Sequence, residues 1–229
     1  MAVTLGTFES YNVKTGSSSL LTGLVSYWKM DESSGNIADS ADSNNGTTTN
    51  VTYSQTGKIG TALLFDGTSF IGFGNPTNLR LSSTGSVSLW FSTINTTGPG
   101  VLISKWDGNT ARNGYAIYVY NGYIEGDISD TSNNVYVGST ISVDTWYHFV
   151  VTWNGTNTIA YLNGSAVETK GGIATVATAY DFTIGRDSGT VADYFNGSMD
   201  EVGVWNRVLT STEITTLYNS GNGKTHPFN

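Results

Sequence analysis

Three acidic side chains in the middle of the chain are the first candidates for chemistry. The segment IEGDISD places Glu125, Asp127 and Asp130 in an E-x-D-x-x-D array. A retaining glycosidase uses two carboxyl groups about 5–5.5 Å apart, whereas side chains two residues apart on a strand stand about 7 Å apart. Only a β-bulge would bring the third acid into range. Acids are also common on the solvent face of a strand, and we therefore expect no catalysis here.

A second pair of acids, Asp200 and Glu201, stands inside the apolar run SMDEVGVW near the end of the sequence. Strand alternation predicts that Asp200 shares a face with Val202 and that Glu201 points to the opposite face. A carboxylate at the edge of the core is costly unless it is paired or binds a metal. Two interpretations stay open: a metal ligand, or an acceptor of backbone N–H groups while Glu201 pairs with Arg207 or Arg80.

Aromatic side chains that could line one sheet face and its rim form a third group. Rings of this kind stack on sugars, while neighbouring Asn and Asp side chains hydrogen-bond to sugar hydroxyl groups. The alternative is that half or more of them fill the core, because a sandwich of this size needs buried aromatic rings. The candidate ligand-binding residues are Trp106, Tyr118, Tyr120, Tyr123 and Tyr136, together with Trp90.

Composition removes several classes of function. The formal net charge of −8 would repel a phosphate backbone, and we expect no nucleic-acid partner. The chain has no cysteine, which excludes disulfides and thiolate metal sites, and no apolar run near the ~20 residues of a membrane span. The N-terminal segment lacks the pattern of a secretion signal. His148 is expected to be structural, and no nucleophile–base–acid set can be assembled.

Strand and turn signals show which elements position these residues. Apolar residues alternate in SVSLWFS, YAIYVY and WYHFVVTW, and Asp-Gly or Asn-Gly pairs supply the turns between strands. Many short strands at close spacing predict a sandwich or jelly roll. One helix is expected near the end, capped by Thr210 with Glu213 in a capping box and stopped at Gly221.

Four segments in order carry a resemblance to a known family. They are GLVSYWKMDESSGNIADSADSNNGT, GKIGTALLFDGTSFIGFG, WYHFVVTWNGTNTIAYLNGS and FNGSMDEVGVWNRVLTSTEITTLYNSG. Together they resemble the laminin G-like family, in its bacterial and phage branch, within the concanavalin A-like lectin and glucanase superfamily. The resemblance implies an all-β fold: a two-sheet antiparallel jelly-roll sandwich with one short C-terminal helix. Its first and last strands would be adjacent, and the helix would plug one end.

The resemblance divides the chain into an N-terminal arm, residues 1–23, and a laminin G-like domain, residues 24–229. It also implies a structural calcium ion, as in some members, for which Asp39, Asn45 and Asp200 occupy matching positions. Because the first strand would lie beside the last, Asp31 completes an oxygen-rich set that suits Ca²⁺. The acidic array resembles the E-x-D-x-x-E motif of the superfamily's retaining glucanases only imperfectly, since Gly126 and Ser129 replace apolar residues.

We therefore expect a non-enzymatic carbohydrate-binding or adhesion module whose partners are cell-surface or polysaccharide glycans. A phage decoration or fibre protein fits, with the arm binding other virion or surface proteins or a second copy, at an extracellular location or on the virion surface. The alternatives are a structural virion or surface component without ligand, and a glycoside hydrolase.

Overall fold

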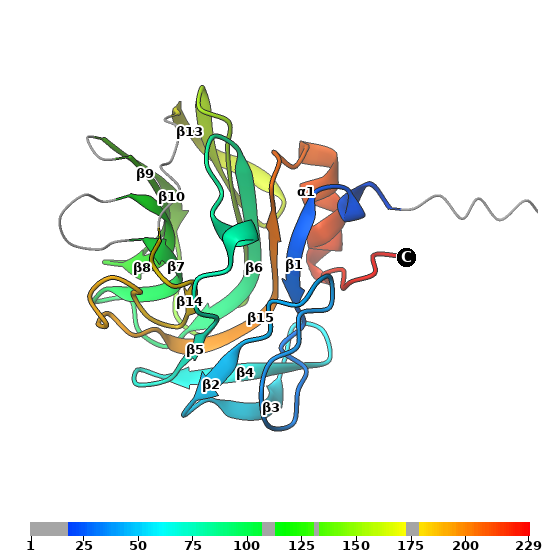
Figure 1. Ribbon diagram of the computed structural model, residues 1–229, viewed down its shortest axis with the longest axis vertical. Helices are drawn as coiled ribbons and strands as arrows, with labels where there is room; N and C mark the ends of the chain where they lie inside the picture. The colour runs from blue at the N-terminus through cyan, green and yellow to red at the C-terminus, as the bar shows by residue number, and fades with distance from the viewer. Residues whose placement is uncertain (1–17, 107–112, 131–132, 173–178) are drawn as a thin grey trace, which may run out of the picture.

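The structure, a computed structural model, describes residues 18–106, 113–130, 133–172 and 179–229. Within these residues, two antiparallel β-sheets face each other (Figure 1), which confirms the predicted all-β jelly-roll sandwich. The eight-stranded sheet has the order β13 (Ser165–Gly171), β12 (Asn157–Leu162), β11 (Tyr147–Trp153), β6 (Gly85–Thr93), β15 (Asn196–Trp205), β4 (Thr61–Asp66) and β3 (Thr52–Thr56), with β1 (Leu24–Trp28) also paired to β15.

The second sheet has seven strands in the described part of the chain. Its order is β10 (Asn134–Thr140), β9 (Tyr123–Ser129), β8 (Gly114–Tyr120), β7 (Gly100–Trp106), β14 (Thr183–Ile184), β5 (Phe70–Gly72) and β2 (Thr47–Thr49). The helix α1 spans Ser211–Tyr218, and three short 3-10 turns span Ser19–Leu21, Thr77–Leu79 and Asn219–Gly221. Within the described residues, no helix is long and apolar enough to cross a membrane.

The main core lies between the two sheets and follows the predicted alternation. In β6, Leu89 and Phe91 point inward and are fully buried, and in β11 Phe149, Val151 and Trp153 do the same. Tyr115, Ile117 and Val119 of β8 supply the facing side chains from the seven-stranded sheet. Burial of apolar surface stabilises the fold by about 25 cal/mol per Å². This inner packing fixes which side chains of each strand remain for the outer faces.

A second core covers the outer face of the eight-stranded sheet. Helix α1 lies there, on the side away from the seven-stranded sheet (Figure 1). Its Ile214 and Leu217 pack with Tyr27, Val150 and Trp205, which project outward from three strands of the sheet. The expectation that the helix plugs one end of the sandwich is therefore wrong. The helix covers a sheet face, because that face carries large apolar side chains that water would otherwise contact.

The helix begins as predicted and ends earlier than predicted. The Thr210 hydroxyl accepts from the backbone N–H of Glu213 at 3.2 Å, and the Glu213 carboxylate accepts from the backbone N–H of Thr210 at 2.9 Å. Arg207 also pairs with Glu213, with Nη2 2.7 Å from Oε1. The C-terminal cap of the helix is Asn219 and not Gly221. Asn219 has the left-handed backbone conformation of such a cap, with a φ of 48° and a ψ of 51°.

A bulge in β15 corrects the predicted orientation of the acids near the end of the chain. The pairing of β15 with β6 shifts between Asp200 and Gly203, and Glu201 has a φ of 51°. Met199 and Val202 both point into the main core, whereas Asp200 points outward beside Trp90. Asp200 therefore does not share a face with Val202, because Glu201 is an extra residue that resets the alternation.

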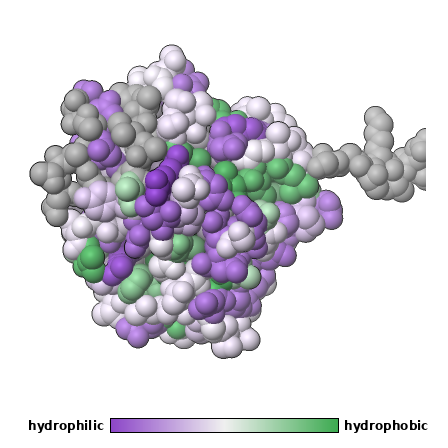
Figure 2. Space-filling view, in the orientation of Figure 1, coloured by the Kyte–Doolittle hydropathy of each residue, from purple (hydrophilic) through white to green (hydrophobic). Residues whose placement is uncertain are grey.

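The folded unit includes residues before the predicted boundary at Leu24. Leu20 is buried in the outer core, and its carbonyl accepts from Trp205 Nε1 at 2.7 Å. Arg207 donates to the carbonyls of Ser19 and Thr22. In Figure 2 a hydrophobic group lies at the side of the molecule where the described chain begins. Residues 18–23 thus belong to the sandwich, and only residues 1–17 of the predicted arm lie outside the described residues.

Removal of the Leu20 side chain tests this correction. We expect Leu20→Ala to lower the free energy of unfolding by about 2–5 kcal/mol, because it leaves a cavity in the outer core. Thr22→Ala is the matched control, since Thr22 is exposed and its hydrogen bonds to Ser19 and Arg207 use backbone groups that the substitution keeps. Urea denaturation of both variants measures the difference. A Leu20→Ala protein as stable as the control would show that residues before Leu24 do not support the fold.

Candidate functional site

The outer face of the seven-stranded sheet brings the predicted acids and aromatic rings together. Strands β8, β9 and β10 pair in continuous antiparallel register, with Glu125 opposite Tyr118 on one side and Gly138 on the other. One pair further along the same face, Asp127 lies between Ala116 and Tyr136. Since outward residues recur every second position, this register places the ligand-binding candidates on one face.

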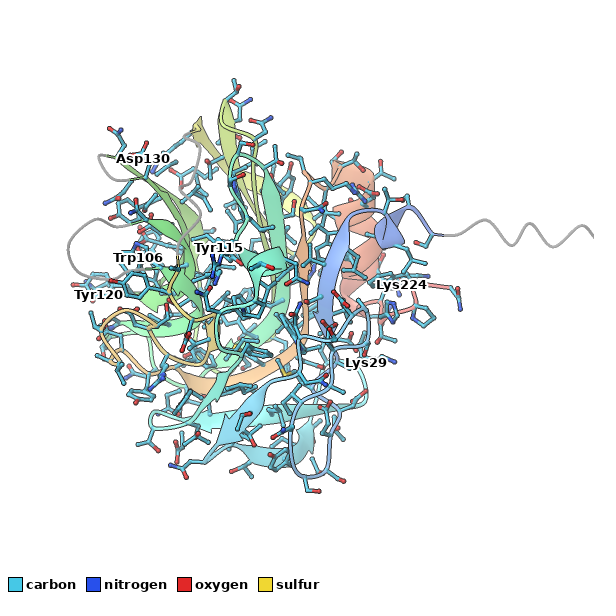
Figure 3. The ribbon with its side chains drawn as sticks, viewed as in Figure 1. Lys29, Trp106, Tyr115, Tyr120, Asp130 and Lys224 are labelled. Atoms are coloured by element: carbon cyan, nitrogen blue, oxygen red, sulfur yellow. The ribbon has the colours of Figure 1, made fainter. Side chains whose placement is uncertain are left out.

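All five predicted aromatic ligand-binding residues lie on this outer face. The Asn-Gly hairpin after β8 sets Tyr120 opposite Tyr123, and these two side chains are 46% and 47% exposed. Tyr118, Tyr136 and Trp106 are half-buried. Figure 3 shows Trp106 and Tyr120 at the margin formed by β7 and β8, with Tyr115 turned to the interior of the sandwich. We name this surface, formed by Trp106, Tyr118, Tyr120, Tyr123 and Tyr136, the aromatic face.

Two carboxylates lie among the rings of the aromatic face. Asp127 is 1% exposed and accepts a hydrogen bond from the Ser129 hydroxyl at 2.5 Å. Glu125 is half-buried and accepts from the Tyr118 phenol. Burial raises the pKa of Tyr118 above its ordinary value, and the charges of Asp127 and Glu125 raise it further. The face therefore combines neutral phenol donors with anionic acceptors.

The third acid of the E-x-D-x-x-D array does not join the other two. Strand β9 pairs with both neighbours over Tyr123–Ser129 without any register shift, and this segment contains no bulge to move Asp130 inward. Asp130 lies after the strand, where its carboxylate accepts from the backbone N–H of Asn133 at 2.7 Å. Asp130 therefore lies outside the outward row that Glu125 and Asp127 form on β9.

A loop between β14 and β15 closes one rim of the aromatic face. The Ser188 hydroxyl lies 2.9 Å from the Ser104 hydroxyl, accepts from the backbone N–H of Trp106 at 3.2 Å and donates to the Trp106 carbonyl at 2.9 Å. Asp187 holds the loop by accepting from Gly189 N–H and the Thr190 hydroxyl. The sequence did not indicate this rim, because the loop contacts a strand more than 80 residues earlier.

Trp90 and His148 do not belong to the aromatic face. Both point outward from the eight-stranded sheet, where the ring of Trp90 stacks on Tyr218 of α1 and lies under the Lys58 ammonium group. Burial lowers the pKa of His148 to about 3, and its Nε2 lies 2.9 Å from the Ser88 hydroxyl. The structural role expected for His148 agrees with this packing, whereas the placement of Trp90 among the ligand-binding rings was wrong.

The four predicted calcium ligands divide into two separate groups. Asp39 accepts from the backbone N–H groups of Tyr27, Ala41 and Asn44, and its own N–H donates to Asn45 Oδ1. Asp31 instead accepts from the Thr61 N–H at 2.8 Å, on the side of Asp200. No group of three acidic, His or Cys side chains in the described chain is arranged to hold a metal ion. Calcium binding by Asp31, Asp39, Asn45 and Asp200 therefore stays a prediction.

Asp200 and Glu201 are buried acids held by neutral donors. Asp200 is fully buried, and its Oδ2 accepts from the backbone N–H groups of Lys58 and Ile59 at 2.8 and 2.9 Å. Glu201 accepts from the Tyr27 phenol at 2.5 Å and does not pair with Arg207. Burial is the main cause that raises the pKa of Asp200 to about 8 and that of Glu201 to about 7, and the nearby charge of Asp31 contributes to both increases.

Comparisons with known proteins agree with the fold. Residues 65–215 match the laminin G-like family model, described as the concanavalin A-like lectin/glucanases superfamily. No curated protein matches the sequence. The binding domain of Paraclostridial Mosquitocidal Protein 1 is 16% identical with a TM-score of 0.70, over 88% of this chain and 53% of that chain.

Two neurotoxin structures are similar in the same way. The receptor binding domain of botulinum neurotoxin mosaic serotype C/D is 15% identical with a TM-score of 0.69, over 88% of this chain and 51% of that one. A structure of botulinum neurotoxin type C, whose cell entry depends on two ganglioside molecules, is 13% identical with a TM-score of 0.65, over 87% and 51%. This chain therefore spans about half the length of these structures.

The buried acids predict that stability falls as the pH rises. In the folded protein both carboxyl groups hold protons that the unfolded chain releases near pH 4, and the stability contributed by their protonation is lost between about pH 4 and pH 8. We expect Asp200→Asn to flatten this slope in thermal melts from pH 5 to pH 8.

Asp66→Asn is the control, because turn hydrogen bonds from Ser69 and Thr68 lower the pKa of Asp66 to about 2, outside that window. An Asp200→Asn slope equal to that of the wild type would refute the raised pKa of Asp200.

The same thermal melts, run on the wild-type protein with Ca²⁺ or EDTA at pH 7, test the calcium prediction. If Asp200 and its neighbours bind calcium, the melting temperature should be higher with Ca²⁺ than with EDTA. Equal melting temperatures under the two conditions would contradict the calcium prediction.

Proposed function

We propose that this chain, a member of the laminin G-like family, is a non-enzymatic carbohydrate-binding module. The family lies within the concanavalin A-like lectin and glucanase superfamily. The ligand would lie on the aromatic face, formed by β7, β8, β9 and β10. The observation that carries this proposal is the gathering of five aromatic side chains and two carboxylates on one outer sheet face.

The chemistry of the aromatic face suits a sugar. Tyr120 and Tyr123 offer exposed ring faces on which the C–H side of a pyranose can stack, while their hydroxyl groups remain in water. Glu125 can accept from sugar hydroxyl groups. The Asn134 amide, which donates to the Tyr136 hydroxyl at 2.9 Å, fixes that ring in place. Few rotatable groups have to be ordered on binding, because the rings are anchored on a paired sheet.

Two observations favour binding over hydrolysis. Asp130 is held in its own turn, which leaves Glu125 and Asp127 without a third acid. Asp127 is buried and bonded to Ser129, a position from which it does not contact bulk solvent. The similar structures are binding domains, one of them from a toxin whose cell entry depends on gangliosides, and this supports a carbohydrate or glycolipid partner.

A place on a virion or cell surface extends the proposal. A sandwich of this family displayed on a phage particle would bind host glycans through the aromatic face. Residues 1–17, which carry Val3, Leu5, Phe8 and Tyr11, would bind a neighbouring subunit or a second copy. The alternatives are a structural surface component without ligand and a glycoside hydrolase. Removal of residues 1–17 would separate assembly from glycan binding, since the described fold begins at Ser18.

A glycan array with the wild-type protein, followed by titration of the best glycan, tests this function. Tyr123→Ala should weaken binding about tenfold or more, because truncation of an exposed aromatic anchor removes stacking area. Tyr180→Ala is the matched control, since Tyr180 is 44% exposed and lies outside β7 to β10.

Three results would count against the proposal. Absence of any glycan binding by the wild type would favour the structural alternative. Equal losses in the Tyr123→Ala and Tyr180→Ala proteins would place the ligand elsewhere. Release of reducing sugar from a β-glucan, abolished by Glu125→Gln, would make the chain a hydrolase.

A further inference from the structure

A hollow beside the aromatic face lies where the edges of the two sheets meet. Strands β10 and β13 are the outermost strands of their sheets and contact each other. The hollow has a volume of about 350 Å³ and is lined by Tyr123, Glu125, Gly138, Val167, Glu168 and Lys170. Gly138 opens this space beside Glu125, and it must be glycine, because a Cβ there would lie 2.1 Å from the Ile124 carbonyl oxygen.

The positive charge at this hollow is already neutralised. Lys170 Nζ lies 3.1 Å from Glu168 Oε1 and donates to the Tyr136 carbonyl at 2.6 Å. The second Glu168 oxygen accepts from the backbone N–H of Gly138 at 2.8 Å. These contacts use Glu168 and Lys170 to fasten β13 to β10. The carboxylate of Glu125 then gives the hollow its net charge.

A second acidic side chain lies behind the hollow. Asp127 is the next outward residue of β9 and is buried. Among the described residues of β7 to β10, Lys105 is the one cationic side chain. It points into the sandwich, where its ammonium group donates to Asn75 Oδ1 and the Tyr180 carbonyl. An anionic sugar in the hollow would therefore be repelled by the Glu125 carboxylate, whereas a cationic one would be attracted.

We propose that the hollow between β9, β10 and β13 recognises a free, protonated amino group on the glycan. The aromatic face then prefers chains of glucosamine-type sugars over N-acetylated or acidic ones. The ammonium group would lie against Glu125 and the ring of Tyr123, which combines a charge-assisted hydrogen bond with a cation–π contact. An N-acetyl group removes the charge, and a carboxylate or sulfate reverses it. This inference rests on the proposed carbohydrate-binding function and names the class of sugar.

The test compares three oligosaccharides of equal length: glucosamine, N-acetylglucosamine and galacturonic acid oligomers. Calorimetric titration of the full chain at pH 6 should give glucosamine oligomers an affinity about tenfold above that of N-acetylglucosamine oligomers, the factor expected for one charge-assisted contact. Galacturonic acid oligomers should bind most weakly. The preference should shrink in 0.5 M salt, where the Debye length falls to about 4 Å.

The Glu125→Gln variant isolates the group responsible. We expect the ratio of the glucosamine affinity to the N-acetylglucosamine affinity to fall to about one, since the amide keeps the size of the side chain and removes its charge. Asp42→Asn makes the same charge change in the loop between β1 and β2 and should leave the ratio as in the wild type. This control separates a local contact from a general effect of the net charge of −8.

The outcomes distinguish recognition of an amino group from carbohydrate binding in general. N-acetylglucosamine or galacturonic acid oligomers that bind as tightly as glucosamine oligomers would overturn the inference and leave a carbohydrate-binding module. A glucosamine preference that survives Glu125→Gln would also overturn it, because the charge would then be recognised elsewhere. Failure to bind any oligosaccharide, here and on the glycan array, would remove the proposed function itself.

Discussion

The central position of β15 is the constraint on which the rest of the structure depends. This strand pairs with β6 along its length, with β4 at its start and with β1 at its end. Its inward residues complete the main core, and its outward residues include Trp205, which is fully buried. Both faces of the strand must therefore be covered. Helix α1, Leu20 and the C-terminal Phe228 cover the outer one.

This constraint decides which surface is left for a ligand. The outer face of the eight-stranded sheet is occupied by α1 and by the turn whose backbone N–H groups bind Asp200. The seven-stranded sheet has no such helix in the described residues, and its outer side chains near the β8–β9 hairpin stay about half exposed. Asp200 and Glu201 of β15 thus lie on the covered face, whereas the half-buried Glu125 of β9 lies on the outer face of the seven-stranded sheet.

Regular features of the sequence predicted the fold, whereas local irregularity and long-range contacts did not follow from it. Alternation placed Leu89 and Phe149 correctly, and the Thr210 capping box is local in sequence. The bulge at Glu201 placed Asp200 on the face opposite to the one expected. A bulge adds one residue to a strand without a recognisable sequence pattern, and the alternation of side chains between the two faces is reset at that point.

The candidate site was predicted in part for the same reasons. Tyr118 and Tyr123 could be assigned to one outward face from alternation, and the structure gathers them there. Glu168 reaches Gly138 from a strand of the other sheet, 30 residues away, and no local pattern encodes such an edge contact. The calcium set stays a prediction. Asp39 is used by backbone N–H groups of its own loop, a role that has the same residue signature as a ligand.

The most direct test of the central claim is a map of the bound glycan on the protein. Backbone amide shifts, followed by nuclear magnetic resonance during titration with the tightest glycan from the array, would report the contact surface. Glycan binding on the aromatic face predicts shifts concentrated in β8, β9 and β10, with the largest around Tyr123 and Glu125, and none in α1. Shifts confined to α1 and the C-terminal segment, or no shifts at saturating glycan, would contradict it.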